Sequence, residues 1–219
     1  MIMIGSVLEG PDLGAVRAAH AAAEFADGRE TAGWAAKLVK NNLQASAGDK
    51  RLDPARAMIA SALEKNAVFQ MAARPRQITP MLFSRYEPGM GYGAHVDDAL
   101  MHGIRTDLSF TLFLDDPETY DGGELVIESA AGEMPFKGPA GSLFLYPSTT
   151  LHRVEVVRTG VRRVAVGWVQ SRVRDAGHRE ILFDLDSARR AMFNQSGKSD
   201  EFDLVSKSLA NLVRMWAEA

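Results

Sequence analysis

Two residues able to bind a metal, His95 and Asp97, stand two positions apart in the segment YEPGMGYGAHVDD, residues 86–98. Because side chains alternate between the two faces of an extended strand, the imidazole and the carboxylate are expected to point to the same side. A nitrogen and an oxygen ligand placed together can hold a divalent cation. The pair alone is better explained by a histidine that packs in a turn, so a metal site needs further ligands.

A third candidate ligand is His152 in LYPSTTLHRVEVV, where a turn rich in Pro, Ser and Thr leads into a strand. In a barrel of two sheets, this strand can face the one that carries His95. Two histidines and one carboxylate leave up to three metal positions open, which is typical of non-haem Fe(II) oxygenases. Zinc usually prefers a closed tetrahedral set or a catalytic set of three ligands. The remaining histidines are expected at the surface: His20, His102 and His178.

An arginine in an apolar strand is the next unusual feature. Arg162 lies ten residues after His152, in GVRRVAVGWVQ. If Val164 and Val166 face inward, Arg162 does so too, while Arg163 faces outward. A buried guanidinium must be paired with an anion. The partner is either a core Asp or Glu or the carboxylate of a ligand, and a nearby iron site favours the ligand, because the planar guanidinium binds a carboxylate through two hydrogen bonds.

The chain divides into three parts that must position these residues. Up to about residue 75 it is mostly helical, and LDPARAMIASALEKN predicts a helix with Asp53 as N-cap and Pro54 at the first helical position. Residues 76–170 contain short strands separated by Gly, Pro and Asp turns, which predicts an antiparallel barrel or a double-sheet jelly roll. From about residue 175 the pattern is helical again, so the fold class is α+β.

Composition excludes several kinds of protein. The chain has 219 residues, a net charge of −3 and no cysteine, so disulfide scaffolds, thiolate metal sites and cysteine nucleophiles are ruled out. The charge gives no indication of binding to nucleic acid or to an anionic membrane. The start, MIMIGSVLEG, lacks the basic region of a signal peptide, and no apolar run approaches the roughly 20 residues of a membrane span. We expect a soluble, cytoplasmic protein.

Taken together, these motifs resemble those of the Fe(II)/2-oxoglutarate-dependent dioxygenases, specifically the bacterial PKHD-type (prolyl/lysyl hydroxylase-like) hydroxylases. The family pattern of His-x-Asp, a long gap, His and a basic residue about ten positions later is met here in full. The flanking segments match as well: RYEPGMGYGAHVDD, LSFTLFLDDPETYDGGELVIE, GSLFLYPSTTLHRV and RRVAVGWVQSRVRD. The resemblance implies a double-stranded β-helix (jelly-roll) core over residues 77–174 with N-terminal helices, a dioxygenase domain over 1–174 and a helical extension over 175–219.

The resemblance also implies roles for individual residues. His95, Asp97 and His152 would bind Fe(II), and Arg162 would hold the distal carboxylate of 2-oxoglutarate. Tyr86 occupies the place of a tyrosine whose hydroxyl contacts that carboxylate, the alternative being a core tyrosine. Two further aromatic residues are expected at the barrel floor and at a substrate wall or turn: Trp168 and Tyr92.

The implied activity is hydroxylation of an unactivated C–H bond with release of succinate and CO₂, using Fe(II), 2-oxoglutarate and O₂, with ascorbate as a reductant. The substrate would be a peptidyl prolyl or lysyl side chain or a small molecule. Two other interpretations are a cupin-type metal enzyme without 2-oxoglutarate, which would have no need of Arg162, and a non-catalytic binding or sensor module.

An apolar stripe predicts that the last helix packs on something. Its members recur at helical spacing: Phe202, Val205, Leu209, Leu212 and Trp216. A helix of this length gains most of its stability from packing. The stripe is expected to cover the N-terminal helices or to meet a second copy of the chain in a homodimer.

Overall fold

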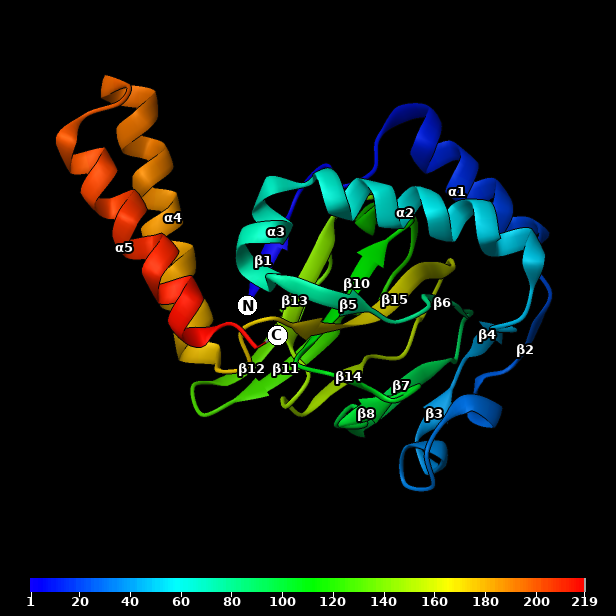
Figure 1. The fold of residues 1–219 in the computed structure, drawn as a ribbon. Helices are drawn as coiled ribbons and strands as arrows, with labels where there is room; N and C mark the ends of the chain where they lie inside the picture. Colours follow the sequence, from blue (N-terminus) through cyan, green and yellow to red (C-terminus); the bar gives the residue numbers. More distant parts are fainter. Residues whose placement is uncertain (219) are drawn as a thin grey trace.

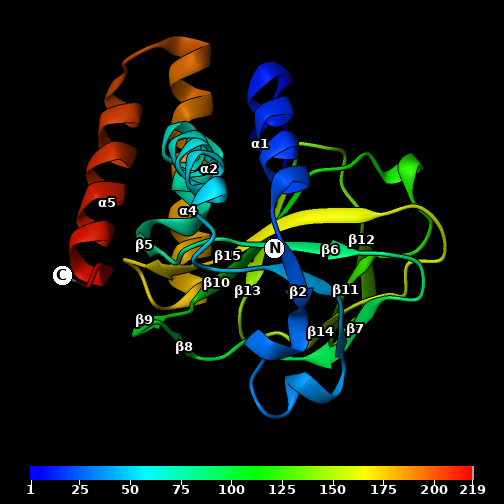
Figure 2. The same ribbon diagram turned by 90° about the vertical axis from the view of Figure 1, so that its right-hand side faces the viewer.

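Two antiparallel sheets form a sandwich, and helices cover one side of it (Figure 1). The computed structural model describes residues 1–218. After a turn of 90°, helices α1 and α2 are seen on one side of the larger sheet, with the smaller sheet on the other (Figure 2). The space between the two sheets therefore lies away from the helices, and the candidate site residues lie in that space.

The larger sheet has eight strands in the order β1-β13-β10-β15-β6-β4-β2, with β5 paired to another stretch of β15. Its strands are β1 (Ile2–Ile4), β2 (Phe25–Asp27), β4 (Leu43–Ala45), β5 (Pro75–Ile78), β6 (Leu82–Tyr86), β10 (Leu108–Phe113), β13 (Leu143–Pro147) and β15 (Arg162–Ser171). Along β15, Ala165 and Val169 belong to the core under the helices, whereas Val164 belongs to the core between the sheets. Arg162, two residues before Val164, therefore points between the sheets.

The smaller sheet has five strands in the order β12-β11-β14-β7-β3. They are β3 (Lys40–Asn41), β7 (Gly91–His95), β11 (Leu125–Ser129), β12 (Gly132–Phe136) and β14 (His152–Val154), and a separate hairpin consists of β8 (Leu100–Met101) and β9 (Ile104–Arg105). Strand β3 pairs with β7 of this sheet, while β4, which follows it directly, pairs with β6 of the larger sheet. Residues 40–45 thus cross from one sheet to the other and close one side of the sandwich.

Three helices cover the larger sheet: α1 (Gly10–Ala22), α2 (Asp53–Lys65) and α3 (Ala67–Ala73). Short 3-10 turns complete the chain before the last helices: η1 (Gly28–Thr31), η2 (Ala36–Leu38), η3 (Lys50–Leu52) and η4 (Pro117–Thr119). Val16, Ile59 and Phe69 are fully buried in the core that these helices form with the sheet, and each stabilises the fold by about 1.5–3 kcal/mol. The prediction of Asp53 as an N-cap is wrong by one residue, because η3 runs directly into α2 and makes Leu52 the flanking residue.

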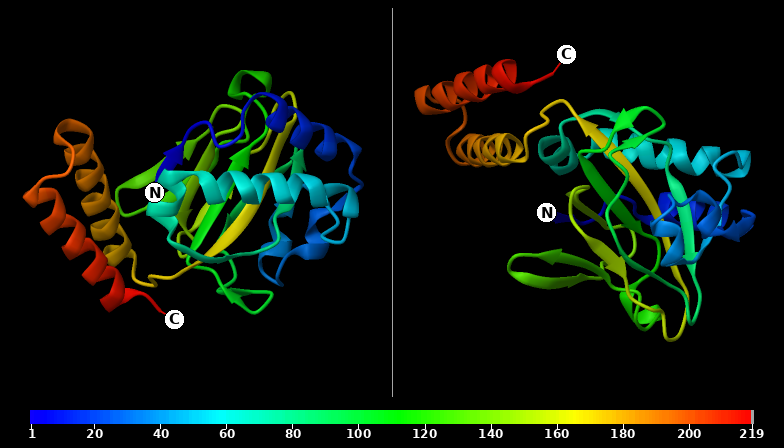
Figure 3. Two further views of the ribbon diagram at one scale, coloured as in Figure 1. Left: turned by 45° about the horizontal axis from the view of Figure 1, so that its top comes forward. Right: turned by 90° about the horizontal axis from the view of Figure 1, so that it is seen from below.

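The last two helices, α4 (Ala176–Ser196) and α5 (Asp200–Trp216), form a hairpin that projects from the sandwich (Figure 3). Leu209, Leu212 and Trp216 of the predicted stripe pack with Leu182 of α4. The expectation that the stripe covers the N-terminal helices is therefore wrong: α5 packs on α4, and it is α4 that contacts α3. No helix within residues 1–218 has both the length and the apolar character that a bilayer crossing requires.

Candidate active site

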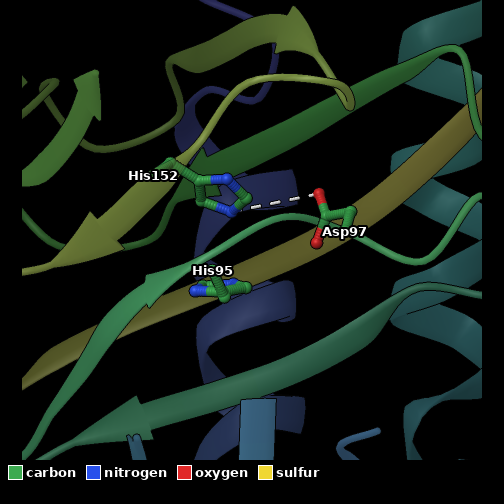
Figure 4. Close-up of side chains that lie close together, drawn as sticks. All are labelled: His95, Asp97 and His152. Atoms are coloured by element: carbon green, nitrogen blue, oxygen red, sulfur yellow. Dashed lines mark ion pairs between the residues drawn. The ribbon is translucent and has the colours of Figure 1, made fainter. Parts of the chain in front are cut away.

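His95, Asp97 and His152 come together between the sheets (Figure 4). Each offers one ligand atom, and these atoms all lie within 4.8 Å of one another. His95 ends β7 and His152 begins β14, and the two residues are direct partners in the antiparallel pairing of these strands. The expectation that the two strands face each other across the barrel is wrong, because they are neighbours in one sheet. Asp97 follows two residues after β7 ends, and its Oδ2 lies 3.9 Å from Nε2 of His152.

Backbone carbonyls fix the orientation of both imidazole rings. Nδ1 of His95 donates to the carbonyl of Gly93 at 2.8 Å, and Nδ1 of His152 donates to the carbonyl of Thr150 at 3.0 Å. With the proton on Nδ1, the Nε2 lone pair of each ring is free to bind a metal. Burial, and then the neighbouring His152, lower the pKa of His95 to about 4. The ring is therefore neutral at physiological pH, as a ligand must be.

Ser109 holds the carboxylate and is itself in contact with Ser148, and the sequence analysis singled out neither serine. Ser109 Oγ donates to Asp97 Oδ2 at 2.5 Å, and it lies 2.7 Å from Oγ of Ser148. Both serines are buried. The sequence feature that could have identified Ser109 is the alternation in LSFTLFL, where Ser109 and Thr111 are the polar residues among large apolar ones. Hydroxyl groups on that inward face have to find polar partners.

Arg162 is a buried guanidinium without a carboxylate partner. It is 1% exposed, and none of the ion pairs found in residues 1–218 includes it. Its Nε has no hydrogen-bond partner, and its Cζ lies 5.0 Å from the centre of the Tyr86 ring. The next residue, Arg163, faces the other way and pairs with buried Asp115. The structural ion pair considered for Arg162 is therefore found at Arg163 instead.

Tyrosines surround Arg162 and the metal ligands. Tyr86 lies directly opposite Arg162 in the pairing of β6 with β15. Burial raises the pKa of Tyr86, and the nearby Arg162 charge opposes that shift. Tyr92 stacks on His95 with ring centres 3.6 Å apart. Burial likewise raises the pKa of Tyr146, whose ring centre lies 5.2 Å from that of His152. All three phenols are protonated at neutral pH and can donate a hydrogen bond.

A single cavity of about 370 Å³ joins these groups. Its lining includes the three candidate ligands, Arg162, the three tyrosines and Trp168. Trp168 was expected to act as a packed barrel floor, but it is only partly buried and its indole nitrogen has no hydrogen-bond partner. Three more polar residues of the wall were not anticipated: Lys40, Asn42 and Gln44. This volume suits a small ligand.

The remaining histidines do not join the ligand set. His20 is 1% exposed and its Nε2 lies 3.2 Å from the carbonyl of Ser84, so the expectation that it lies at the surface is wrong. His102 is exposed at the rim of the cavity. His178 is half-buried and stacks on Trp216, with ring centres 4.0 Å apart.

The donor set fits the groups that the motifs imply. Two neutral imidazoles and one carboxylate on one side of a cavity match the 2-His-1-carboxylate set that binds Fe(II) and leaves positions open for small ligands. The Arg162 guanidinium fits a carboxylate, because its buried Nε is left without an acceptor in the protein. One cavity therefore offers a divalent metal site and, deeper in the sandwich, an anion site.

Comparison with known proteins gives consistent results. Residues 81–170 match the family model of the 2OG-Fe(II) oxygenase superfamily. The chain is 58% identical over 196 residues to a PKHD-type hydroxylase of Picosynechococcus sp., covering 90% of each chain. It is 53% identical over the full length of both chains to a PKHD-type hydroxylase of Synechococcus elongatus.

Solved structures share the fold at much lower identity. A prolyl hydroxylase from Trichoplax adhaerens, in complex with a hypoxia inducible factor peptide fragment, aligns with a TM-score of 0.60 at 16% identity, covering 82% of this chain and 86% of that one. A prolyl-4-hydroxylase from Pseudomonas putida aligns with a TM-score of 0.52 at 22% identity, covering 78% and 92%. Together with the two antiparallel sheets, these likenesses confirm the predicted jelly-roll core and the α+β class.

Proposed function

The chain belongs to the PKHD-type hydroxylases of the 2OG-Fe(II) oxygenase superfamily, and on that premise we propose that His95, Asp97 and His152 bind its Fe(II). The observation that supports this most directly is the convergence of their ligand atoms within 4.8 Å on one wall of the cavity. The cupin-type and non-catalytic interpretations are set aside, because relatives at 53–58% identity are hydroxylases.

The enzyme is a 2-oxoglutarate-dependent dioxygenase. With Fe(II), 2-oxoglutarate and O₂ it hydroxylates an unactivated C–H bond and releases succinate and CO₂. The metal and the cosubstrate supply the oxidising power, and the protein supplies binding, orientation and exclusion of water.

Arg162 and Tyr86 are proposed to bind the distal carboxylate of 2-oxoglutarate. Arg162 lies in the same cavity as the metal ligands, is fully buried and lacks a protein anion. Tyr86 lies beside it with its hydroxyl protonated, so it can donate to the same carboxylate. A dicarboxylate anchored on Arg162 and Tyr86 would extend toward the metal ligands. This anchoring would orient its keto acid end toward the metal.

Other residues of the chain keep the ligands in place. Ser109 holds one oxygen of Asp97, while the carbonyls of Gly93 and Thr150 hold the Nδ1 protons of the two histidines. Such partners fix the direction of each lone pair and limit the reorganisation that metal binding requires. Tyr92 and Tyr146 pack against the rings of His95 and His152 and limit the access of water to them.

Several finer points belong to the same proposal. The substrate is a peptidyl prolyl or lysyl side chain or a small molecule, and ascorbate serves as a reductant that keeps the iron in its Fe(II) state. The protein acts in the cytoplasm. Residues 1–174 form the dioxygenase domain and 175–219 its helical extension, which also provides a surface for a homodimer.

The metal assignment is tested by replacing each ligand with alanine and measuring bound iron after dialysis. His95→Ala, Asp97→Ala and His152→Ala are each expected to lose iron and to abolish succinate release while the barrel stays folded. His102→Ala is the matched control, because His102 lies on the same cavity but outside the ligand set. Full iron occupancy in all three variants would contradict the assignment.

A further inference from the structure

Lys40 carries a buried ammonium group without a counter-ion. Its side chain lines the cavity and the residue is 8% exposed. Nζ donates to Gln44 Oε1 at 2.8 Å and to Thr31 Oγ1 at 3.2 Å, and both acceptors are neutral. Within residues 1–218 no carboxylate oxygen forms an ion pair with Lys40. An ammonium has three N–H donors, so one remains available.

Lys40 is the first of three polar residues on one face of the crossing segment 40–45. Asn42 and Gln44 follow at alternate positions, are 3% and 4% exposed, and line the same cavity. Both amide atoms of Asn42 and the Nε2 of Gln44 have no hydrogen-bond partner. Buried polar groups are costly when left unsatisfied and are rarely retained without a partner. Their concentration on this wall indicates a surface that a polar ligand completes.

Lys40 lies apart from the cosubstrate anchor, whereas Asn42 lies beside Tyr86 of that anchor. Lys40 on β3 pairs with Tyr92 on the neighbouring strand β7, and β7 also carries His95. Nζ lies 5.3 Å from the centre of the Tyr92 ring, whose other stacking partner is His95. Arg162, by contrast, lies on β15 of the opposite sheet. The cavity therefore has two separate cationic groups, one carried by each sheet.

The charges inside the cavity leave one positive charge without a partner once iron and cosubstrate are bound. The positive charges are the two of Fe(II) and those of Lys40 and Arg162. The negative charges are the one of Asp97 and the two of 2-oxoglutarate. The negative total is therefore one smaller than the positive total. Asp98 also lines the cavity but is exposed, so solvent screens it.

Burial lowers the pKa of Lys40 to about 8, and the Asp97 charge opposes this. A second anion near Lys40 would stabilise the charged ammonium.

We propose that Lys40, together with the amide of Gln44, binds a carboxylate of the molecule that is hydroxylated. This inference rests on the proposed function, because it takes the metal and Arg162 as the sites of iron and 2-oxoglutarate. It narrows the substrate to molecules that carry a carboxylate close to the C–H bond that is oxidised. A prolyl or lysyl peptide without a nearby acid would leave the ammonium of Lys40 unpaired, which is costly in a buried site.

The test measures binding of ¹³C-acetate and of acetamide by ligand-observed NMR, using the Fe(II)-loaded enzyme under nitrogen with saturating 2-oxoglutarate. Acetate is expected to bind and acetamide is not. Lys40→Met, which keeps the length of the side chain, is expected to weaken acetate binding roughly tenfold or more, as for loss of one charge-assisted hydrogen bond. Lys40→Arg is expected to retain it. Equal binding of acetate and acetamide by the wild-type enzyme would overturn the proposal even if a variant failed to fold.

Two further results would also overturn it. One is equal acetate affinity in the wild type and Lys40→Met. The other is a loss of 2-oxoglutarate affinity in Lys40→Met with acetate binding unchanged, which would make Lys40 part of the cosubstrate site. Iron content and 2-oxoglutarate affinity are measured on the same samples, so a failure of the proposed function is seen separately.

Competition experiments identify the source of the carboxylate. Displacement of acetate by L-proline or L-lysine would support a free amino acid, and displacement by N-acetyl-L-aspartic acid amide would support an acidic peptide. Displacement by neutral N-acetyl-L-prolinamide alone would contradict a carboxylate requirement.

Discussion

Replacing Arg162 with methionine separates the two roles that a buried arginine can have. A guanidinium that holds the fold together has a carboxylate partner in the protein, whereas one that binds a ligand does not. Arg162 is 1% exposed and its Nε is unpaired. Arg163 is the matched control, because its Nε donates to Oδ2 of buried Asp115 at 2.9 Å. The two adjacent substitutions are therefore expected to have opposite effects on ligand affinity and on stability.

The magnitudes follow from these contacts. A hydrogen bond to a charged group contributes about 1.5–3 kcal/mol, so Arg162→Met should raise the Kd for 2-oxoglutarate roughly 10- to 150-fold. It should leave the free energy of unfolding of the metal-free protein unchanged or higher, because an unpaired buried charge is removed. Arg163→Met should leave the Kd unchanged and lower the free energy of unfolding by roughly 1–3 kcal/mol, because the buried Asp115 carboxylate loses its charged partner.

Calorimetric titration of 2-oxoglutarate into the Fe(II)-loaded variants under nitrogen gives the affinities, and urea unfolding of the metal-free proteins gives the stabilities. Wild-type affinity of Arg162→Met for 2-oxoglutarate would refute a ligand-binding role of Arg162. The same role would be refuted if Arg162→Met unfolded several kcal/mol more easily than the wild type while Arg163→Met lost affinity for 2-oxoglutarate.

Three other predictions concern different parts of the molecule. Burial lowers the pKa of His20 to about 4, so the contribution of the neutral ring to stability is complete above pH 6.5 and is lost as the pH falls toward 4. Between pH 7 and pH 5 the free energy of unfolding should therefore fall by about 2 kcal/mol more in the wild type than in His20→Gln. Equal falls of the two proteins in urea titrations would contradict this. Ser109→Ala removes the hydroxyl that holds Asp97 and should weaken iron binding roughly tenfold in chelator competition, whereas an unchanged iron affinity would show that Ser109 does not position the ligand. Truncation after residue 197 removes α5 from its packing on α4 and should lower the melting temperature before it lowers iron occupancy. The homodimer is tested by light scattering of the intact 23.9 kDa chain, and a strictly monomeric mass at micromolar concentration rejects it.

Local patterns in the sequence were enough to find the residues of the candidate metal site. The His-x-Asp spacing, the turn before His152 and the arginine inside an apolar strand each identify a residue from its immediate neighbours. The pairing of β7 with β14 was not predictable, because strand register depends on contacts between segments about 60 residues apart. The strand that carries His152 was therefore expected across the barrel and lies in the same sheet.

The wall formed by Lys40, Asn42 and Gln44 was missed for a different reason. Strands β3 and β4 contain only two and three residues, which is too short for a periodic pattern, and a lysine in such a segment is usually exposed. His20 illustrates the same limit within a helix. Its alanine-rich neighbourhood does not distinguish the buried face from the exposed one, and burial was decided by the packing of α1 on the larger sheet.

The central claim is that one cavity holds Fe(II) on His95, Asp97 and His152 and 2-oxoglutarate on Arg162. Crystals grown without oxygen in the presence of Fe(II) and 2-oxoglutarate test it most directly, through anomalous diffraction at the iron edge. One iron peak is expected within bonding distance of the Nε2 atoms of His95 and His152 and of the Asp97 carboxylate, with the distal carboxylate of 2-oxoglutarate on the Arg162 guanidinium. An iron peak elsewhere, or 2-oxoglutarate bound away from Arg162, would contradict it.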